Sequence, residues 1–405
     1  MDVSKIRSHF PALDQKQLEV RKYYKKSSTR QGPSFHPQET TALTDDSISK
    51  YLATNNVQLG ASYPIGQAST KLVDEGTKAV ANYINASPEE VVLGPSTTQL
   101  FRNLSQSLYD YITPDSEIIV SKLDHEANIA SWVQLAKDRG ATLKWCEPED
   151  KTNPQIAPDV LRKLMSDKTR LFACTQTSNI LGTINDVKAI AKTVHEVPGA
   201  LFCVDAVAYA PHRAIDVRDW GVDFYSFSWY KLYGPHIACL YASKPAQKHM
   251  RTLGHYFKPT NTLENLLGLA AANYELTASI PEVVKYLEAV PWEEISKYEE
   301  KLQKILIDYL KSKEEIQIWG EPVADRGKRV PVISWSVKGK SSKEVVEAVE
   351  GKSNFGWGAF YSNRLVEEVL GLDPVDGIVR VSMLHYNTED EIREFVKVFD
   401  QVVFQ

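Results

Sequence analysis

The sequence predicts an α/β fold, in which a mostly parallel seven-stranded sheet is joined to a smaller C-terminal α+β domain. Between residues 90 and 242, short β-branched and aromatic runs alternate with segments of helical periodicity. Such alternation is typical of crossover units in a parallel sheet with helices on both faces. After about residue 280, a long helical stretch is followed by two strand-like and two helical runs, which is typical of an α+β unit.

The elements follow one another in a regular order. Strand-like runs of the first unit are residues 90–94, 117–121, 142–146, 170–175, 201–206, 223–228 and 237–242. Helical runs lie between them at 98–112, 128–139, 158–166 and 185–195. The second unit has strands at 329–337 and 377–384 and helices at 342–350 and 388–399. We therefore expect a partly irregular N-terminal segment over 1–45, a large domain over 46–285 and a small domain over 286–405.

Composition and charge exclude several classes of protein. The net charge of −5 and the pI of about 6.0 argue against a nucleic-acid binder, which would have a basic face. No apolar run approaches the ~20 residues of a membrane helix, and the N-terminus has no signal pattern. The four cysteines form no C-x-x-C pair and have no histidine at zinc spacing. We expect a cytoplasmic protein without membrane, nucleic-acid or metal partners.

Polar side chains stand at the ends of successive predicted strands. In open α/β sheets, ligands bind just beyond the carboxyl ends of the strands. Each residue alone has an ordinary structural explanation, such as a helix cap, a turn or a lysine that extends to solvent. Together they predict a binding site, and the small residues of 94–98 at a helix start favour a phosphate there. The residues are Thr97, Thr98, His125, Asn179, Asp205, Ser228 and Lys231.

Four motifs connect these residues to a known family. They are S-x-x-K-x-x-G-P at 228–235, D-H-x-A-N at 124–128, S-N-x-x-G-T at 178–183 and R-V-S-x-x-H-Y-N-T at 380–388. From about Asp46 to the C-terminus the sequence resembles the class V aminotransferase superfamily of pyridoxal phosphate enzymes, in the cysteine-desulfurase-like branch, and most closely its fungal secondary-metabolism members. The resemblance implies a fold-type-I architecture, pyridoxal 5′-phosphate as cofactor and a homodimer.

The resemblance also implies three catalytic residues. Lys231 should form a Schiff base with the cofactor aldehyde, and its apolar setting should lower its pKa and favour that chemistry. Once released by the substrate, the same amine is the natural general base. Asp205 should pair with the pyridinium nitrogen, and His125 should stack on the ring face.

The remaining site residues are implied in the same way. Phosphate contacts are expected from Thr97, Thr98 and Ser228. Asn179 should hydrogen-bond the ring hydroxyl and face the substrate, and Arg380 should bind the substrate α-carboxylate in a bidentate way. Tyr230, beside the lysine, is also expected at the cofactor.

The chain departs from cysteine desulfurases at four places, and at one of them an alanine, around Ala271, stands where the threonine that the partner subunit contributes is expected. Tyr230 stands where they carry a histidine, and Ala208 where they carry a glutamine. Residues 354–380 contain no cysteine, although the persulfide-forming cysteine is expected there. We therefore predict a pyridoxal phosphate enzyme that acts on a small amino acid through an external aldimine, with C–C or C–S bond chemistry and without a persulfide cysteine. The alternatives are a class V aminotransferase and a non-catalytic remnant that binds the cofactor.

One segment does not follow the family pattern. Residues 15–31 contain six cations and one anion, and residues 14–46 lack the strand and loop that the family has there. Our hypothesis is that about 15–45 derive from an altered reading frame, so that activity is low even with Lys231 intact. Sequencing the transcript tests this hypothesis, since a transcript that encodes the segment in frame would refute it.

Overall fold

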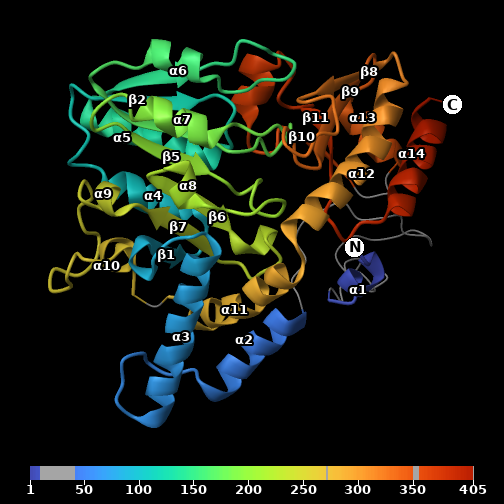
Figure 1. Ribbon diagram of the computed structural model, residues 1–405. Coiled ribbons are helices and arrows are strands. Elements are labelled where there is room, and N and C mark those ends of the chain that lie inside the picture. Colours follow the sequence, from blue (N-terminus) through green and yellow to red (C-terminus); the bar gives the residue numbers. More distant parts are fainter. Residues whose placement is uncertain (10–41, 271, 350–354, 405) are drawn as a thin grey trace.

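The computed structural model describes residues 1–9, 42–270, 272–349 and 355–404 (Figure 1). The segment that we expect to derive from an altered reading frame covers about residues 15–45. Residues 15–41 of it are not among the described residues, so that hypothesis stays a prediction. Its last residues, 42–45, begin helix α2, Ala42–Thr54. No helix in the described part of the chain is both long and apolar enough to cross a membrane.

A seven-stranded sheet forms the centre of the larger body, in the order β1-β7-β6-β5-β4-β2-β3. Its strands are β1 (Val91–Gly94), β2 (Glu117–Ser121), β3 (Thr142–Cys146), β4 (Thr169–Thr175), β5 (Leu201–Asp205), β6 (Phe224–Ser228) and β7 (Ala238–Ala242). β7 pairs antiparallel with both β1 and β6, whereas the other pairs are parallel. β7 is therefore the one strand of this sheet that runs in the opposite direction, and the predicted mostly parallel seven-stranded sheet is confirmed.

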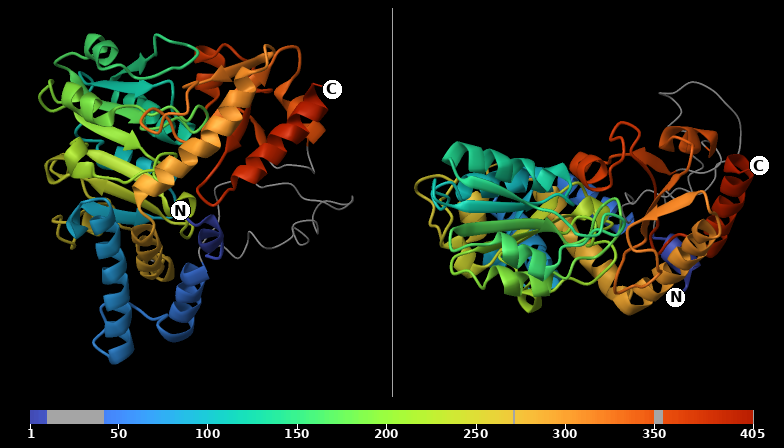
Figure 2. Two further views of the ribbon diagram at one scale, coloured as in Figure 1. Left: turned by 45° about the vertical axis from the view of Figure 1, so that its right-hand side comes forward. Right: turned by 90° about the horizontal axis from the view of Figure 1, so that it is seen from above.

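Alternate residues of the strands enter two apolar cores, one on each face of the sheet. In β4, Phe172 and Cys174 belong to one core and Leu171 and Ala173 to the other. This two-sided burial explains why the strands read as continuous apolar runs. The helices of this body lie on both sides of the sheet (Figures 1 and 2). They are α3 (Pro64–Tyr83), α4 (Thr97–Ser107), α5 (Ala130–Arg139), α6 (Pro158–Leu164), α7 (Val187–Val194), α8 (Val217–Trp220), α9 (Lys244–Gln247), α10 (Leu263–Leu267) and α11 (Tyr274–Ala289).

The C-terminal body contains a four-stranded antiparallel sheet in the order β10-β11-β9-β8. Its strands are β8 (Ile316–Trp319), β9 (Val332–Val337), β10 (Gly356–Gly358) and β11 (Ile378–Ser382). Helices α12 (Trp292–Lys311), α13 (Ser342–Val349) and α14 (Glu389–Val403) pack on it through a third core. The short N-terminal helix α1 (Val3–Arg7) contacts this body, because Arg7 donates to the backbone oxygen of Tyr386.

Three details correct the sequence prediction. The helix expected over 98–112 ends at Ser107, although Leu108 and Ile112 are buried. The apolar spacing continues through a turn after the helix, and periodicity alone does not separate the two. Strands β8 and β10 were not predicted, because they are only four and three residues long.

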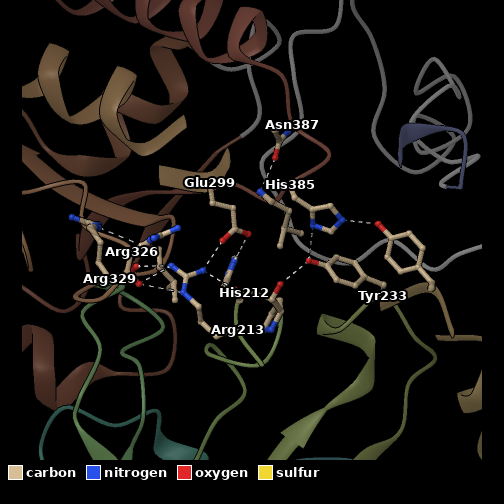
Figure 3. A network of polar contacts seen from close by, with 12 residues as sticks. His212, Arg213, Tyr233, Glu299, Arg326, Arg329, His385 and Asn387 are labelled. Carbon is tan, nitrogen blue, oxygen red and sulfur yellow. Dashed lines mark hydrogen bonds and ion pairs between the residues drawn. The ribbon is translucent and has the colours of Figure 1, made fainter. Parts of the chain in front are cut away.

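A buried polar network connects the two bodies (Figure 3). Glu299 on α12 is fully buried, accepts a hydrogen bond from Arg213 at 2.9 Å and lies 2.8 Å from His212 Nδ1. Arg213 also donates to the backbone oxygen of Arg326 at 3.1 Å. Because His212 and Arg213 follow β5 in the larger body, this ion pair joins α12 to that body.

A second part of the same network lies close to Lys231. His385, in the loop before α14, is 2.6 Å from the Tyr286 hydroxyl and 3.2 Å from the Tyr233 hydroxyl. Burial lowers the pKa of His385 to about 4, so the ring is neutral at physiological pH. Tyr233 follows Lys231 by two residues, so the small domain directly supports the turn that holds this lysine.

Candidate active site

A cavity opens where the carboxyl ends of the parallel strands meet. Eight of the nine predicted site residues line it, and these are Thr97, Thr98, His125, Asn179, Asp205, Ser228, Tyr230 and Lys231. The ninth, Arg380, comes from β11 and donates to the backbone oxygen of Asn179 at 2.9 Å. The structure therefore brings all nine residues into one region, to which both bodies contribute.

Asp205 and Lys231 have pKa values shifted toward each other. Asp205 is buried at the end of β5, and burial raises its pKa to about 6, against the opposing effects of the Val207 amide and Lys231. Lys231 ends the short helical turn Trp229–Lys231 after β6, and burial together with Arg380 lowers its pKa to about 8. Near neutral pH, Asp205 is mostly ionised, and a minor fraction of Lys231, far larger than for an ordinary lysine, is the neutral, nucleophilic amine.

The start of helix α4 provides the cavity with hydrogen-bond donors for an anion. Helix α4 begins at Thr97, and its first backbone amides have no partner within the helix. Ser96 caps the helix by accepting from the Gln99 amide at 3.1 Å. The hydroxyls of Thr97 and Ser228 are both buried and 2.8 Å apart, while Thr98 is exposed at the rim. This arrangement is typical of a phosphate site.

His125 follows β2 and is neutral in this environment. Its Nδ1 accepts a hydrogen bond from the Ala127 amide at 3.1 Å, which leaves the proton on Nε2. Burial, with smaller effects from Lys231 and Arg380, lowers its pKa to about 4. A neutral ring beside two cations suits stacking on a flat ligand better than proton transfer.

Tyr230 lies at the edge of the cavity and is half-buried. Its ring stacks on His236, with centroids 5.0 Å apart and planes 5° from parallel. Burial and the nearby Asp205 raise its pKa, so the phenol is protonated. Tyr230, which stands where a histidine is expected from the resemblance to cysteine desulfurases, therefore lines the cavity with an aromatic ring and a hydroxyl group.

Arg380 is held by neutral groups. Its guanidinium donates to the Asn179 backbone oxygen and lies 3.7 Å from the centre of the Phe360 ring. Burial lowers its pKa to about 10, so it stays charged at neutral pH. Arg380 forms no ion pair with any residue in the described part of the chain, and a guanidinium without a carboxylate partner is suited to a carboxylate ligand.

Asn179 is held in place by residues 360–362 of the small domain. Its amide nitrogen donates to the backbone oxygen of Phe360 at 3.0 Å, and its amide oxygen accepts from the Ser362 hydroxyl at 3.0 Å. These bonds set the orientation of the amide and leave one of its two N–H groups for a ligand.

Some residues of the site were missed by sequence reasoning. Thr177 lines the cavity, and its buried hydroxyl has no partner among the described residues. Its position after β4, within residues 175–179, was the signal that could have identified it. Phe360, Tyr361 and Ser362 had no such signal, because nothing local in residues 359–362 indicates that they pack on Asn179, Arg380 or His125.

The donor set fits pyridoxal phosphate. A nucleophilic amine, a buried carboxylate, a flat neutral ring and an anion-binding helix start converge on one cavity. The Thr177 hydroxyl, which has no hydrogen-bond partner among the described residues, adds a buried polar group whose burial is unfavourable unless a ligand bonds to it.

Comparison with known proteins gives consistent matches. Residues 29–395 match the family model described as aminotransferase class-V. The aminotransferase-like protein FGM3 of Gibberella zeae is 48% identical over 99% of this chain and 98% of its own length. The cysteine desulfurase-like protein ustD of Aspergillus flavus is 37% identical over 100% of this chain and 91% of its own length. The solved structure of apo cysteine desulfurase from Thermococcus onnurineus NA1 has a TM-score of 0.84 and 21% identity, and covers 99% of this chain and 98% of that one.

Proposed function

The chain belongs to the class-V aminotransferase family, and we propose that within it the protein acts on a small amino acid and makes or breaks a C–C or C–S bond next to the α-carbon. Enzymes of this family depend on pyridoxal phosphate, and the fold of the related cysteine desulfurase structure confirms the predicted fold-type-I architecture. The observation that best supports the proposal is the Asp205–Lys231 pair, with its shifted pKa values, beside a cationic Arg380.

The proposed roles follow from what each side chain can do. When bound, pyridoxal phosphate withdraws electrons from the bonds at the α-carbon of an attached amino acid. Lys231 would hold the cofactor covalently and, when released, remove or return a proton at the substrate carbon. Asp205 would pair with the ring nitrogen and hold its proton, and His125 would cover one face of the ring.

The other residues would bind and orient the ligands. Thr97, Thr98 and Ser228, with the first amides of α4, would hold the phosphate. Asn179 would donate to the ring hydroxyl, and Arg380 would bind the α-carboxylate. Tyr230 would close the cavity on the side where it stacks on His236.

We expect the main reaction to continue after thiol alkylation. All four cysteines lie in strands and are buried. Burial raises the pKa of Cys146 to about 12 and that of Cys174 and Cys203 well above the usual value, so their thiols are unreactive. Turnover should therefore be the same before and after treatment of the folded protein with iodoacetamide. Loss of activity together with a persulfide mapped to any of the four cysteines would overturn this prediction.

We propose that the protein is a homodimer with its active sites at the interface. Support comes from exposed aromatic side chains, since Tyr256 is 96% and Phe257 69% exposed, and clustered exposed apolar groups mark interfaces. Light scattering should give about twice the 45.6 kDa of one chain. A fully active species with the mass of one chain would contradict the proposal.

A spectral screen tests the proposed function. Purified protein should show the yellow band of the bound cofactor, and the band should shift with the amino-acid substrate. We would titrate aspartate, cysteine, alanine and cysteine conjugates, and identify the products of any responder. Formation of a keto acid from the amino donor, without C–C or C–S chemistry, would establish an aminotransferase instead. Absence of any shift would refute the proposal.

A further inference from the structure

We infer that Phe360 is a positioning residue, which holds the Arg380 guanidinium at the angle needed to bind the carboxylate of the substrate. The inference rests on the proposed function, because it concerns how the same site would bind an amino acid. It extends that function by assigning a role to a segment of the small domain, Ala359–Ser362, that has no motif of its own.

The first argument is the geometry of the stack. The carbon at the centre of the Arg380 guanidinium lies 3.7 Å from the centre of the Phe360 ring. At this distance the ring supports one face of the planar guanidinium and leaves its edge N–H groups free to donate. One of them donates to the Asn179 backbone oxygen at 2.9 Å. The two contacts together fix both the plane and the rotation of the guanidinium.

The second argument is the charge of the partners. The ring and the carbonyl oxygen are neutral, so they hold Arg380 without cancelling its positive charge. Arg213 shows the contrast, because the buried carboxylate of Glu299 neutralises it at 2.9 Å. A positioning partner without charge leaves the full attraction of Arg380 to an incoming carboxylate.

The third argument is that neighbouring residues make room for the ring. Gly356 on β10 pairs directly with Arg380 on β11. A Cβ atom at Gly356 would lie 3.2 Å from the nearest Phe360 ring atom, which is tighter than ordinary contact. The missing side chain at this register position therefore leaves the space beside Arg380 that the Phe360 ring uses.

The fourth argument is that the segment Ala359–Ser362 is hydrogen-bonded to the large domain. The Ser362 hydroxyl donates to the Asn179 amide oxygen at 3.0 Å, and the Glu126 amide donates to the Tyr361 backbone oxygen at 2.8 Å. Phe360 and Tyr361 have φ values of 46° and 62°, in the left-handed region that side chains other than glycine rarely adopt. Such a conformation persists where the surroundings impose it, and here those surroundings are the site itself.

The test compares each amino acid that shifts the cofactor band with its primary amide, which lacks the carboxylate. We would measure the dissociation constants of both ligands from the shift of the band. Phe360→Leu should weaken binding of the acid by about 3- to 30-fold, the range of a partly desolvated cation–π contact, and leave binding of the amide unchanged. Phe360→Tyr, which keeps the ring face, should restore the wild-type ratio.

Gly356→Ala provides a second variant that acts on the same contact. It should displace the Phe360 ring and, like Phe360→Leu, weaken binding of the acid relative to the amide. If Phe360→Leu does not fold, Gly356→Ala tests the inference in its place. Equal weakening of both ligands, or an unchanged ratio in a folded variant, would overturn the inference alone. A wild-type protein that responds to no amino acid would refute the proposed function and, with it, this inference.

Discussion

Lys231→Ala should abolish covalent attachment of the cofactor and lower turnover by about 10⁴-fold or more. The residue is in the cavity, beside Asp205 and at the end of β6, and its lowered pKa of about 8 makes the neutral amine accessible near physiological pH. The variant removes both the group that would hold the cofactor and the group that would move a proton at the substrate carbon. Absorbance of the bound cofactor and steady-state turnover measure the two losses separately.

The control for this variant is Lys188→Ala, because Lys188 is an exposed lysine that pairs with Asp219 and does not line the cavity. It should match the wild type in both measurements. In cofactor-free wild-type protein, the rate of attachment should rise as the pH rises through about 8, because only the neutral amine of Lys231 is nucleophilic. Catalytic turnover by Lys231→Ala would show that the site is assigned to the wrong lysine.

Asp205→Asn should lower turnover by about 10²- to 10³-fold, the loss expected when one preorganised charged group is removed from an active site. The asparagine keeps an oxygen that can accept from the Val207 amide, which Asp205 does at 2.9 Å, so the local fold should be preserved. Only the negative charge that would hold the proton on the ring nitrogen is lost. The cofactor should still bind, because its phosphate and covalent attachments are made by other residues.

The pH dependence of the wild type provides a second readout for Asp205. Burial raises its pKa to about 6 in the cofactor-free protein, and a cation paired with it would lower that pKa. Activity should therefore be lost on the acid side at or below about pH 6, where the carboxylate becomes protonated. Asp219→Asn, at an exposed ion pair, is the matched control and should leave activity unchanged. Equal activity of Asp205→Asn and the wild type would argue against the proposed role.

The large sheet and most of the site were predictable from the sequence for one physical reason. Parallel strands end at the same edge of a sheet, so polar residues placed at successive strand ends must converge. Asp205 ends β5, Ser228 ends the adjacent strand β6 and Lys231 follows it, and the structure places all three around one cavity. The continuous apolar character of β4 and β5 likewise reports burial on both faces, which a strand needs in such a sheet.

The small domain's contribution to the site was decided by tertiary structure. Arg380 was identified by its motif, but its contact with Phe360 depends on the pairing of β10 with β11 and on how the following turn folds back. The left-handed residues Phe360 and Tyr361 have no local signal, because neither is a glycine and their conformation is imposed by contacts with Asn179 and Glu126.

The orientation of the two bodies has the same origin. Glu299 lies on a helix whose sequence shows an ordinary amphipathic pattern, yet it is fully buried between His212 and Arg213. A buried carboxylate is stable only when such partners are present, and these partners lie 86 and 87 positions away along the chain. Local periodicity and motif spacing determined which strands form and which residues stand at their ends. Only the packing of distant segments determined which neutral and charged neighbours those residues acquire.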